Sequence, residues 1–268
     1  MSFVEIDESR KEIWVLTMNR PERMNALSIR MVQDLRDTMA RVNRSRTCRV
    51  AILRGEGRGF CAGADLKGEE ERLDNTEGMS ELGYIYKMQE NLAELMLGVR
   101  ECQKPIIAAI HGAAVGGGLA LSLASDIRVA ATDATFGSVF IRVGLSSCDV
   151  GTSYLLPRIV GASRAAELML TGRHFDADEA LAIGLVHRVV APEALLECAL
   201  ETARLIAKNS EYGVWMTKQG LWANLDAPSL RHAIELENRT QVLGTFTGNM
   251  REAIEAFQAK RDPEWKPL

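Results

Sequence analysis

Residues 105–125 read PIIAAIHGAAVGGGLALSLAS, a stretch of 21 residues without a formal charge. A helix of this length could span a membrane. The stretch begins with Pro105, however, and contains His111 and four glycines, which does not fit a membrane span. We therefore predict a buried strand over residues 106–110, then a glycine-rich turn, then a helix of small residues over 119–124.

A second glycine-rich segment, GFCAGADL at residues 59–66, follows a predicted strand at 49–54. Because glycine and alanine carry little bulk, a ligand can approach the backbone of such segments closely. Backbone N–H groups at the start of a helix can also hold negative charge. Two segments of this kind facing one point would form an oxyanion hole. The alternative is that both are tight turns that let helices pack closely.

The common phosphate-binding and hydrolase motifs are absent from the sequence. Neither glycine-rich segment continues as Gly-Lys-Ser/Thr, which excludes a P-loop. The glycines at positions 55, 57 and 59 do not have the dinucleotide-binding spacing. No G-x-S-x-G motif occurs, so an ordinary serine hydrolase is excluded as well.

The composition is that of a globular protein: of 268 residues, 47% are apolar and 25% are charged, with a formal net charge of −4. No block of lysine and arginine is present, so we expect neither nucleic acid nor a membrane as a partner. The five cysteines are scattered and odd in number, which predicts neither a zinc site nor a disulfide framework. A reducing compartment fits best, and the acidic residues near the N-terminus leave no signal-peptide core, so we expect a cytoplasmic protein.

The first half of the chain mixes strands with helices, and the part after residue 151 is mostly helical. Residues 65–79 are predicted to form a charged loop, in which the run Glu69-Glu70-Glu71 is solvated or folds over a ligand. Predicted strands lie at 3–6, 13–19, 49–54, 106–110, 126–131 and 186–190. Predicted helices lie at 28–42, 80–99, 119–124, 152–160, 163–171, 177–183, 192–208, 213–222, 229–243 and 249–260.

Several motifs follow one another in order along nearly the whole chain. They are NRP at 19–21, NAL at 25–27, FCAGADL at 60–66, the segment 105–118, ATFG at 134–137, LPR at 156–158 with Gly161, the segment 180–186, and FQAKRDP at 257–263. This set resembles the crotonase superfamily, also called the enoyl-CoA hydratase/isomerase family. The resemblance implies an α/β fold, a crotonase-like spiral of ββα units with a helical C-terminal trimerisation region. Residues 1–200 would form the acyl-CoA-binding core and residues 201–268 the oligomerisation region of a homotrimer or a dimer of trimers.

The resemblance also implies a chemistry. The N–H groups of Ala64 and Gly117 would bind the carbonyl oxygen of a thioester, on which negative charge grows as an enolate forms. Coenzyme A would be bound as part of the acyl-CoA substrate, and no metal or separate cofactor is expected. The positions that match CoA contacts in relatives are Arg23, Ala26, Ala62, Asp65 and Leu66, together with Phe257 and Lys260, which would reach a neighbouring subunit's CoA. For Lys260 the alternative is a solvated charge on a helix.

The sequence departs from the family at the residues that would perform hydration. Typical hydratases use two glutamates as acids and bases, and Ala120 and Phe140 occupy those two positions here. Asp149, the only carboxylate in the nearby segment 143–151, is our candidate acid–base group. Its alternative role is to cap the helix predicted from residue 152, since Asp is a favoured N-cap. Cys148 is predicted to be a buried small residue rather than a nucleophile.

These observations predict an acyl-CoA lyase or isomerase of the enoyl-CoA hydratase kind that acts through an enolate. Isomerisation needs one base to move a proton, so Asp149 alone could suffice, or Ser146, Ser147 and Asp149 could together hold a water molecule. The alternative from another class is a catalytically silent acyl-CoA-binding protein that keeps the oxyanion hole and the CoA contacts. The apolar residues predicted to be buried between subunits are Trp215, Trp222, Leu225, Leu230 and Leu236.

Overall fold

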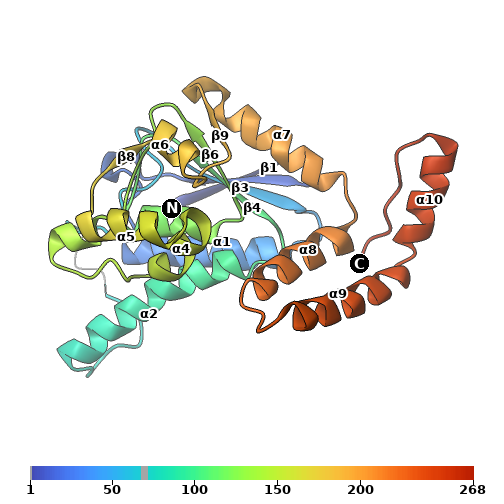
Figure 1. Cartoon of the computed structure of the whole chain (residues 1–268). Coiled ribbons are helices and arrows are strands. Elements are labelled where there is room, and N and C mark those ends of the chain that lie inside the picture. The colour runs from blue at the N-terminus through green and yellow to red at the C-terminus, as the bar shows by residue number, and fades with distance from the viewer. Residues whose placement is uncertain (1, 68–71) are drawn as a thin grey trace.

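A six-stranded sheet forms the centre of the protein, whose computed structural model describes residues 2–67 and 72–268 (Figure 1). The strand order is β1-β2-β3-β4-β6-β9, with β1 antiparallel to β2 and every other neighbouring pair parallel. The strands are β1 Val4–Arg10, β2 Ile13–Met18, β3 Val50–Gly55, β4 Ile106–Ile110, β6 Ile127–Ala131 and β9 Arg188–Val190. All six predicted strands are confirmed, while the run Glu69-Glu70-Glu71 lies outside the described residues.

Helices cover both faces of this sheet, and alternating side chains explain how. In β3, Ala51 and Leu53 belong to one hydrophobic core, whereas Val50 and Ile52 belong to another, because successive side chains of a strand point to opposite faces. The first core is shared with helices α1 Ile29–Arg44, α2 Glu81–Arg100 and α3 Gly117–Ala124. The second core is covered by α7 Leu195–Ala207, on the opposite side of the sheet in Figure 1. This helix spans residue 200, and residues on both sides of that point pack on the sheet.

A small second sheet carries one of the glycine-rich segments. It contains β5 Ala113–Val115, β7 Thr135–Gly137 and β8 Phe175–Asp176, in the order β5-β7-β8. The sequence predicts only a turn at residues 113–115, because three residues of Ala-Ala-Val are too short to show a strand pattern. The rings of Phe136 and Phe175 stack with centroids 5.5 Å apart and join β7 to β8.

Local sequence signals set the helix boundaries as expected. Ser28 is the N-cap of α1 and its hydroxyl accepts a hydrogen bond from the N–H of Met31. Ser80 caps α2 in the same way, with Gly83 as the donor. The predicted helices of the second half are confirmed as α4 Thr152–Val160, α5 Ala162–Thr171, α6 Ala177–Ala182, α7, α8 Glu211–Asn224, α9 Leu230–Thr245 and α10 Asn249–Ala259. Short 3-10 turns lie at Pro21–Arg23, Val139–Val143 and Pro192–Ala194.

The last three helices form an arm that extends from the body, with α8 next to the sheet and α10 at its far end (Figure 1). Buried polar contacts fasten α8 to the edge of the core. The ammonium of Lys218 lies 2.8 Å from a carboxylate oxygen of Asp126, and the indole N–H of Trp222 donates to the other oxygen at 3.0 Å. The indole N–H of Trp222 therefore already has a hydrogen-bond partner within its own chain. No described helix is both long enough and apolar enough to cross a membrane.

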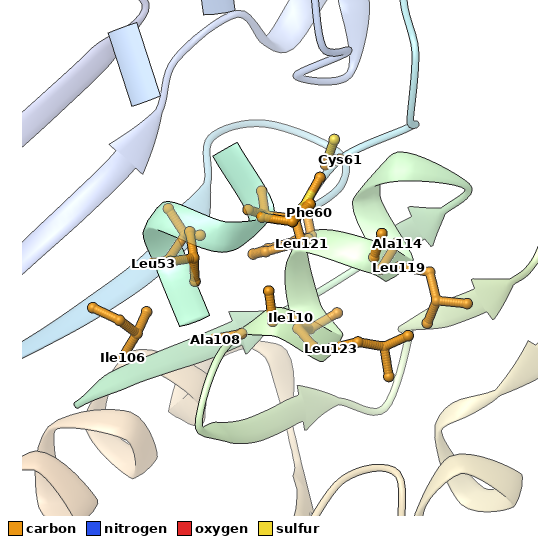
Figure 2. Close-up of a cluster of buried hydrophobic side chains, with 14 of the residues drawn as sticks. Leu53, Phe60, Cys61, Ile106, Ala108, Ile110, Ala114, Leu119, Leu121 and Leu123 are labelled. Atoms are coloured by element: carbon orange, nitrogen blue, oxygen red, sulfur yellow. The ribbon is translucent and has the colours of Figure 1, made fainter. Parts of the chain in front are cut away.

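Figure 2 shows the core directly beneath the glycine-rich segments, where Phe60 and Cys61 meet Ala114, Leu119 and Leu121. All five side chains are fully buried. The backbones approach so closely here that a Cβ atom on Gly118 would lie 2.1 Å from the carbonyl oxygen of Cys61. Only glycine fits at position 118, and this close contact fixes the start of α3 against residues 59–66.

Candidate active site

The two glycine-rich segments lie side by side, joined by backbone hydrogen bonds. The N–H of Cys61 donates to the carbonyl of Ala113 at 2.8 Å, and the N–H of Val115 donates back to Cys61 at 3.2 Å. On the other side, the N–H of Leu27 donates to the carbonyl of Gly63 at 2.7 Å. The segment at 61–65 is therefore held between β5 and the residues that precede α1.

This packing brings the backbones of Ala64 and Gly117 together. A Cβ atom on Gly63 would lie 3.2 Å from the amide nitrogen of Gly117, and one on Gly117 would lie 3.8 Å from the amide nitrogen of Ala64. Gly117 is the first residue of α3, where an N–H has no acceptor inside the helix. Within the described residues, neither amide donates a hydrogen bond to the protein. Two adjacent, unused N–H groups can hold an oxygen that carries negative charge.

A pocket of about 430 Å³ opens beside Ala64, between α1, the 64–66 segment and α2. Ala64 and Leu27 line it, and the methyl Cδ1 of Leu27 would lie 2.9 Å from a Cβ atom on Gly117. The wall formed by α2 is largely apolar and contains Ile85 and Met88. If the two amides bind the oxygen of a molecule, an apolar group attached to that oxygen would therefore contact Ile85 and Met88.

The two positions without glutamate are filled by apolar side chains close to the amides. Ala120 is fully buried in α3, one turn after Gly117. Phe140 is 8% exposed, and its ring atom Cε1 would lie 3.9 Å from a Cβ atom on Gly116. Neither residue can exchange a proton with a bound molecule, so this part of the site is chemically inert.

The structure rejects the capping role of Asp149. Helix α4 begins at Thr152 with Gly151 as its N-cap and has no side-chain cap. The carboxylate of Asp149 instead accepts a hydrogen bond from the side-chain amide of Gln89, a residue that lines the pocket on α2. Asp149 is not itself among the residues that line the pocket, and this hydrogen bond joins it to a lining residue 60 positions away in sequence.

Strained backbone follows Asp149 directly. Val150 has a φ of +38°, in the left-handed region that a β-branched side chain rarely adopts. Gly151 follows with a φ of +84°. Such conformations cost on the order of 1–3 kcal/mol and gather at functional sites, so the strain fits a functional role for the residue that it positions.

The residues just before Asp149 differ from the sequence predictions, both for the burial of Cys148 and for the hydroxyl groups of Ser146 and Ser147. Cys148 is exposed rather than buried, because the loop before α4 turns its side chain away from the core. The hydroxyl of Ser147 donates to the carbonyl of Met169 at 2.9 Å, and the hydroxyl of Ser146 accepts from the N–H of Cys148. Both serines therefore already have partners in the protein.

Asp65, predicted to contact CoA, has two arginines as partners. Its side chain is 5% exposed, and its oxygens lie 2.6 Å from Arg20 and 3.2 Å from Arg23. Burial by itself raises the pKa of Asp65, but the hydrogen bonds from Arg20 and from the N–H of Lys67 outweigh it, and the pKa lies below its usual value. Asp65 thereby holds Arg23, which is itself partly exposed, next to the mouth of the site.

This arrangement predicts a pH-dependent contribution to stability. We expect Asp65→Asn to lower the free energy of unfolding at neutral pH by about 1–3 kcal/mol, the usual cost of leaving a charged partner unsatisfied. Because the folded pKa is depressed, the difference should be constant above the ordinary value of 3.8 and shrink as the pH falls below it. Urea denaturation of both proteins between neutral and acidic pH measures this difference. A difference that grows on acidification would contradict the assignment.

The other predicted CoA residues fall into two groups. Leu66 lines the pocket and is 75% exposed, whereas Ala26 is buried, Ala62 is half-buried, and neither alanine is among the lining residues. Phe257 and Lys260 lie at the end of α10, far from α1 and α2 in Figure 1, and Phe257 is 85% exposed. A single chain therefore does not bring these two residues to its own pocket.

Gln89 is the residue that the sequence analysis missed. Its only signal is its position within the helix, where it shares one face with Ile85, Met88 and Leu92 and interrupts an apolar stripe. No cluster of three or more potential metal ligands occurs in residues 2–67 or 72–268.

Known proteins match both the sequence and the fold. The sequence model of the enoyl-CoA hydratase/isomerase family matches residues 8–267. A protein of Mycobacterium tuberculosis named "Probable enoyl-CoA hydratase EchA12" is 41% identical over 264 residues, 98% of this chain and 92% of that protein. The crystal structure of a probable enoyl-CoA hydratase/isomerase from Mycobacterium abscessus superposes with a TM-score of 0.93 at 41% identity, covering 99% of each chain. A monofunctional enoyl CoA isomerase from M. smegmatis has a TM-score of 0.74 at 40% identity, over 87% of this chain and 99% of that one. With its sheet, its paired glycine-rich segments and these relatives, the chain belongs to the enoyl-CoA hydratase/isomerase family, and its fold is the crotonase fold.

Proposed function

We infer that the protein is an enoyl-CoA isomerase that moves a carbon–carbon double bond with one carboxylate, Asp149, as both base and acid. The observation that carries this proposal is the contrast between three positions. Asp149 is hydrogen-bonded to Gln89, a residue that lines the pocket, whereas the positions of the two hydratase glutamates hold Ala120 and Phe140. One proton-transfer group suits an isomerisation, which only relocates a proton.

The reaction would begin with a 3-enoyl-CoA whose thioester oxygen accepts hydrogen bonds from Ala64 and Gly117. The carboxylate of Asp149 takes a proton from C2, and the electron pair spreads over a dienolate that ends on the thioester oxygen. The resulting carboxylic acid returns the proton to C4, so the double bond moves from C3–C4 to C2–C3. Atoms balance without any added reactant, and Asp149 ends in its starting state.

The two amides would supply most of the electrostatic stabilisation. Their adjacency and lack of protein acceptors support this role. Loss of a single donor of this kind typically costs about 2.7–4 kcal/mol of transition-state stabilisation. Arg23, held by Asp65, would meet the CoA nucleotide at the mouth, where Ala26, Ala62 and Leu66 leave room for the pantetheine.

Classical hydration lacks its machinery in this chain. Addition of water needs one group to activate the water and another to deliver a proton to the adjacent carbon. Of the two serines that could help Asp149 to hold a water, Ser147 already donates its O–H to the carbonyl of Met169, whereas Ser146 only accepts a hydrogen bond, from the N–H of Cys148. The name of the M. smegmatis relative, an enoyl CoA isomerase, supports isomerisation for this chain as well.

The decisive experiment is to incubate the protein with 3-enoyl-CoA thioesters of several chain lengths in deuterated water. Isomerisation produces the absorbance of a conjugated thioester. Because Asp149 carries the proton from C2 to C4, deuterium should enter at C4 only to the extent that the carboxylic acid exchanges with solvent. A product heavier by one water would instead indicate hydration. Tight binding of acyl-CoA without any turnover at any chain length would favour a catalytically silent binding protein and overturn the proposal.

We further propose that the arm mediates trimer formation and that the neighbouring chain brings Phe257 and Lys260 to the pocket. Large apolar side chains are exposed along α9 and α10, among them Leu243, Phe246 and Phe257, exposed by 61%, 83% and 85%. Exposed apolar surface of this extent is expected to be covered by another chain.

The oligomeric state gives a direct prediction. We expect a trimer or hexamer in light scattering at micromolar concentration, and we expect the double variant Leu243→Asp, Phe246→Asp to dissociate because it buries charge in the proposed interface. The control Lys11→Asp changes an exposed charge in the turn between β1 and β2 and should leave the mass unchanged. A monomeric wild-type protein would contradict the proposal.

A further inference from the structure

Helix α2 presents two polar side chains, Gln89 and Asn91, to a pocket wall that is otherwise apolar on this helix. Residues 85, 88, 89 and 92 follow the spacing of a single helix face, and all four line the pocket that contains Ala64. Three of these four are Ile85, Met88 and Leu92, so Gln89 is the hydrogen-bond donor among them. Asn91, the other polar residue of α2 that lines the pocket, is buried and accepts a hydrogen bond from Arg36. Gln89 is exposed, so its side-chain amide is free to reach a partner on another element.

The partner of Gln89 is Asp149. The side-chain nitrogen Nε2 of Gln89 donates to Oδ1 of Asp149, and within the described residues this is the one hydrogen bond of that carboxylate. The bond fixes one oxygen and leaves Oδ2 without a protein partner there. A carboxylate held by one oxygen presents the other in a defined direction, which is what a base needs in order to meet a C–H group.

The chemistry of the donor also suits a base. An arginine or lysine partner would stabilise the charged carboxylate strongly and would weaken it as a proton acceptor. The amide of glutamine is neutral and does not titrate, so it orients the carboxylate with a smaller effect of this kind. Asp65, a carboxylate that does line the pocket, has the opposite arrangement, with two arginines as partners.

We propose that Gln89 is a positioning residue that aims the Asp149 carboxylate at the bound acyl chain. This inference rests on the proposed isomerase function, in which Asp149 is the base. Gln89 does not exchange protons itself, and its effect reaches the substrate through Asp149. Helix α2 also carries Ile85, Met88 and Leu92, which line the pocket. The same helix would therefore contact the acyl chain and orient the carboxylate of Asp149.

The test is a double-mutant cycle with Gln89→Met, which keeps the unbranched length of the side chain but removes the donor. We expect Gln89→Met to lower kcat about 10-fold or more, while KM and the affinity for acyl-CoA change little. In an Asp149→Asn background the same substitution should have no further effect on kcat, since there is no base left to aim. Lys87→Met, an exposed neighbour on α2, is the matched control and should leave kcat unchanged.

The two proposals fail in different ways. If Gln89→Met lowers kcat by the same factor in both backgrounds, Gln89 acts independently of Asp149, and the positioning role is overturned while Asp149 stays the base. If Asp149→Asn is fully active, the isomerase mechanism is overturned, and the positioning role with it. If Gln89→Met raises KM and leaves kcat unchanged, Gln89 binds substrate and does not aim the base.

Discussion

Asp149→Asn should lower turnover of 3-enoyl-CoA by about 10²-fold or more while leaving the affinity for acyl-CoA unchanged. The reason is that the substitution removes the proton acceptor but keeps its shape and an oxygen that can still accept from Gln89. The expected loss is of the usual size for an acid–base group. Steady-state rates, together with calorimetric titration of a saturated acyl-CoA, separate the effect on chemistry from the effect on binding.

Folding is the control for this substitution. Asp149 does not cap α4 by its side chain, so we expect the thermal midpoint of Asp149→Asn to stay close to that of the wild type. Loss of affinity together with loss of turnover would show that the variant has distorted the pocket. Full activity would remove the base and leave no carboxylate at any of the catalytic positions that the family resemblance identifies.

Gly118→Ala should be a strongly destabilising substitution in the active-site region. A Cβ atom at this position would lie 2.1 Å from the carbonyl oxygen of Cys61, a backbone atom that cannot move without shifting residues 59–66. Overpacking a core typically costs about 1–3 kcal/mol, and a backbone clash lies at or above the upper end. We expect the free energy of unfolding, measured by urea denaturation, to fall by about 3 kcal/mol or more. We also expect residues 59–66 to be displaced.

Gly98→Ala is the matched control. Gly98 also lies inside a helix, α2, but a Cβ atom there would have no heavy atom within 4 Å. Alanine is the better helix former, so this variant should be more stable by about 0.5–1 kcal/mol. Equal effects of the two substitutions would contradict the close-contact explanation for Gly118.

Much of the fold could be predicted because its signals are local. The serine caps at Ser28 and Ser80 and the apolar run at 106–110 mark their elements directly. The small second sheet could not be predicted, because β5 and β8 are two or three residues long and exist only through their pairing with β7. A strand of that length has no periodicity of its own.

The site shows the same division. The glycine-rich segments predict from sequence that backbones approach each other closely. That the two segments are neighbours follows from the pairing of Cys61 with Ala114 in the fold. The contact between Gln89 and Asp149 joins residues 60 positions apart and depends on how α2 lies across the sheet. The capping prediction for Asp149 was wrong because Gly151, with its left-handed backbone, takes the cap position instead. Cys148 was predicted to be buried from the general habit of free cysteines, and its place in the loop before α4 overrides that habit.

The main-chain origin of the paired amides has an evolutionary consequence. A point mutation replaces side chains, so a lineage that keeps this backbone keeps the N–H groups of Ala64 and Gly117 whatever residues surround them. Positions 120, 140 and 149 can then change their chemistry one at a time, while the thioester stays seated. An ancestral hydratase could lose its glutamates and acquire a single base through intermediates that still bound their substrate. New reactions in such a lineage would therefore arise when a few reactive side chains are replaced, while the backbone that binds the substrate is inherited unchanged.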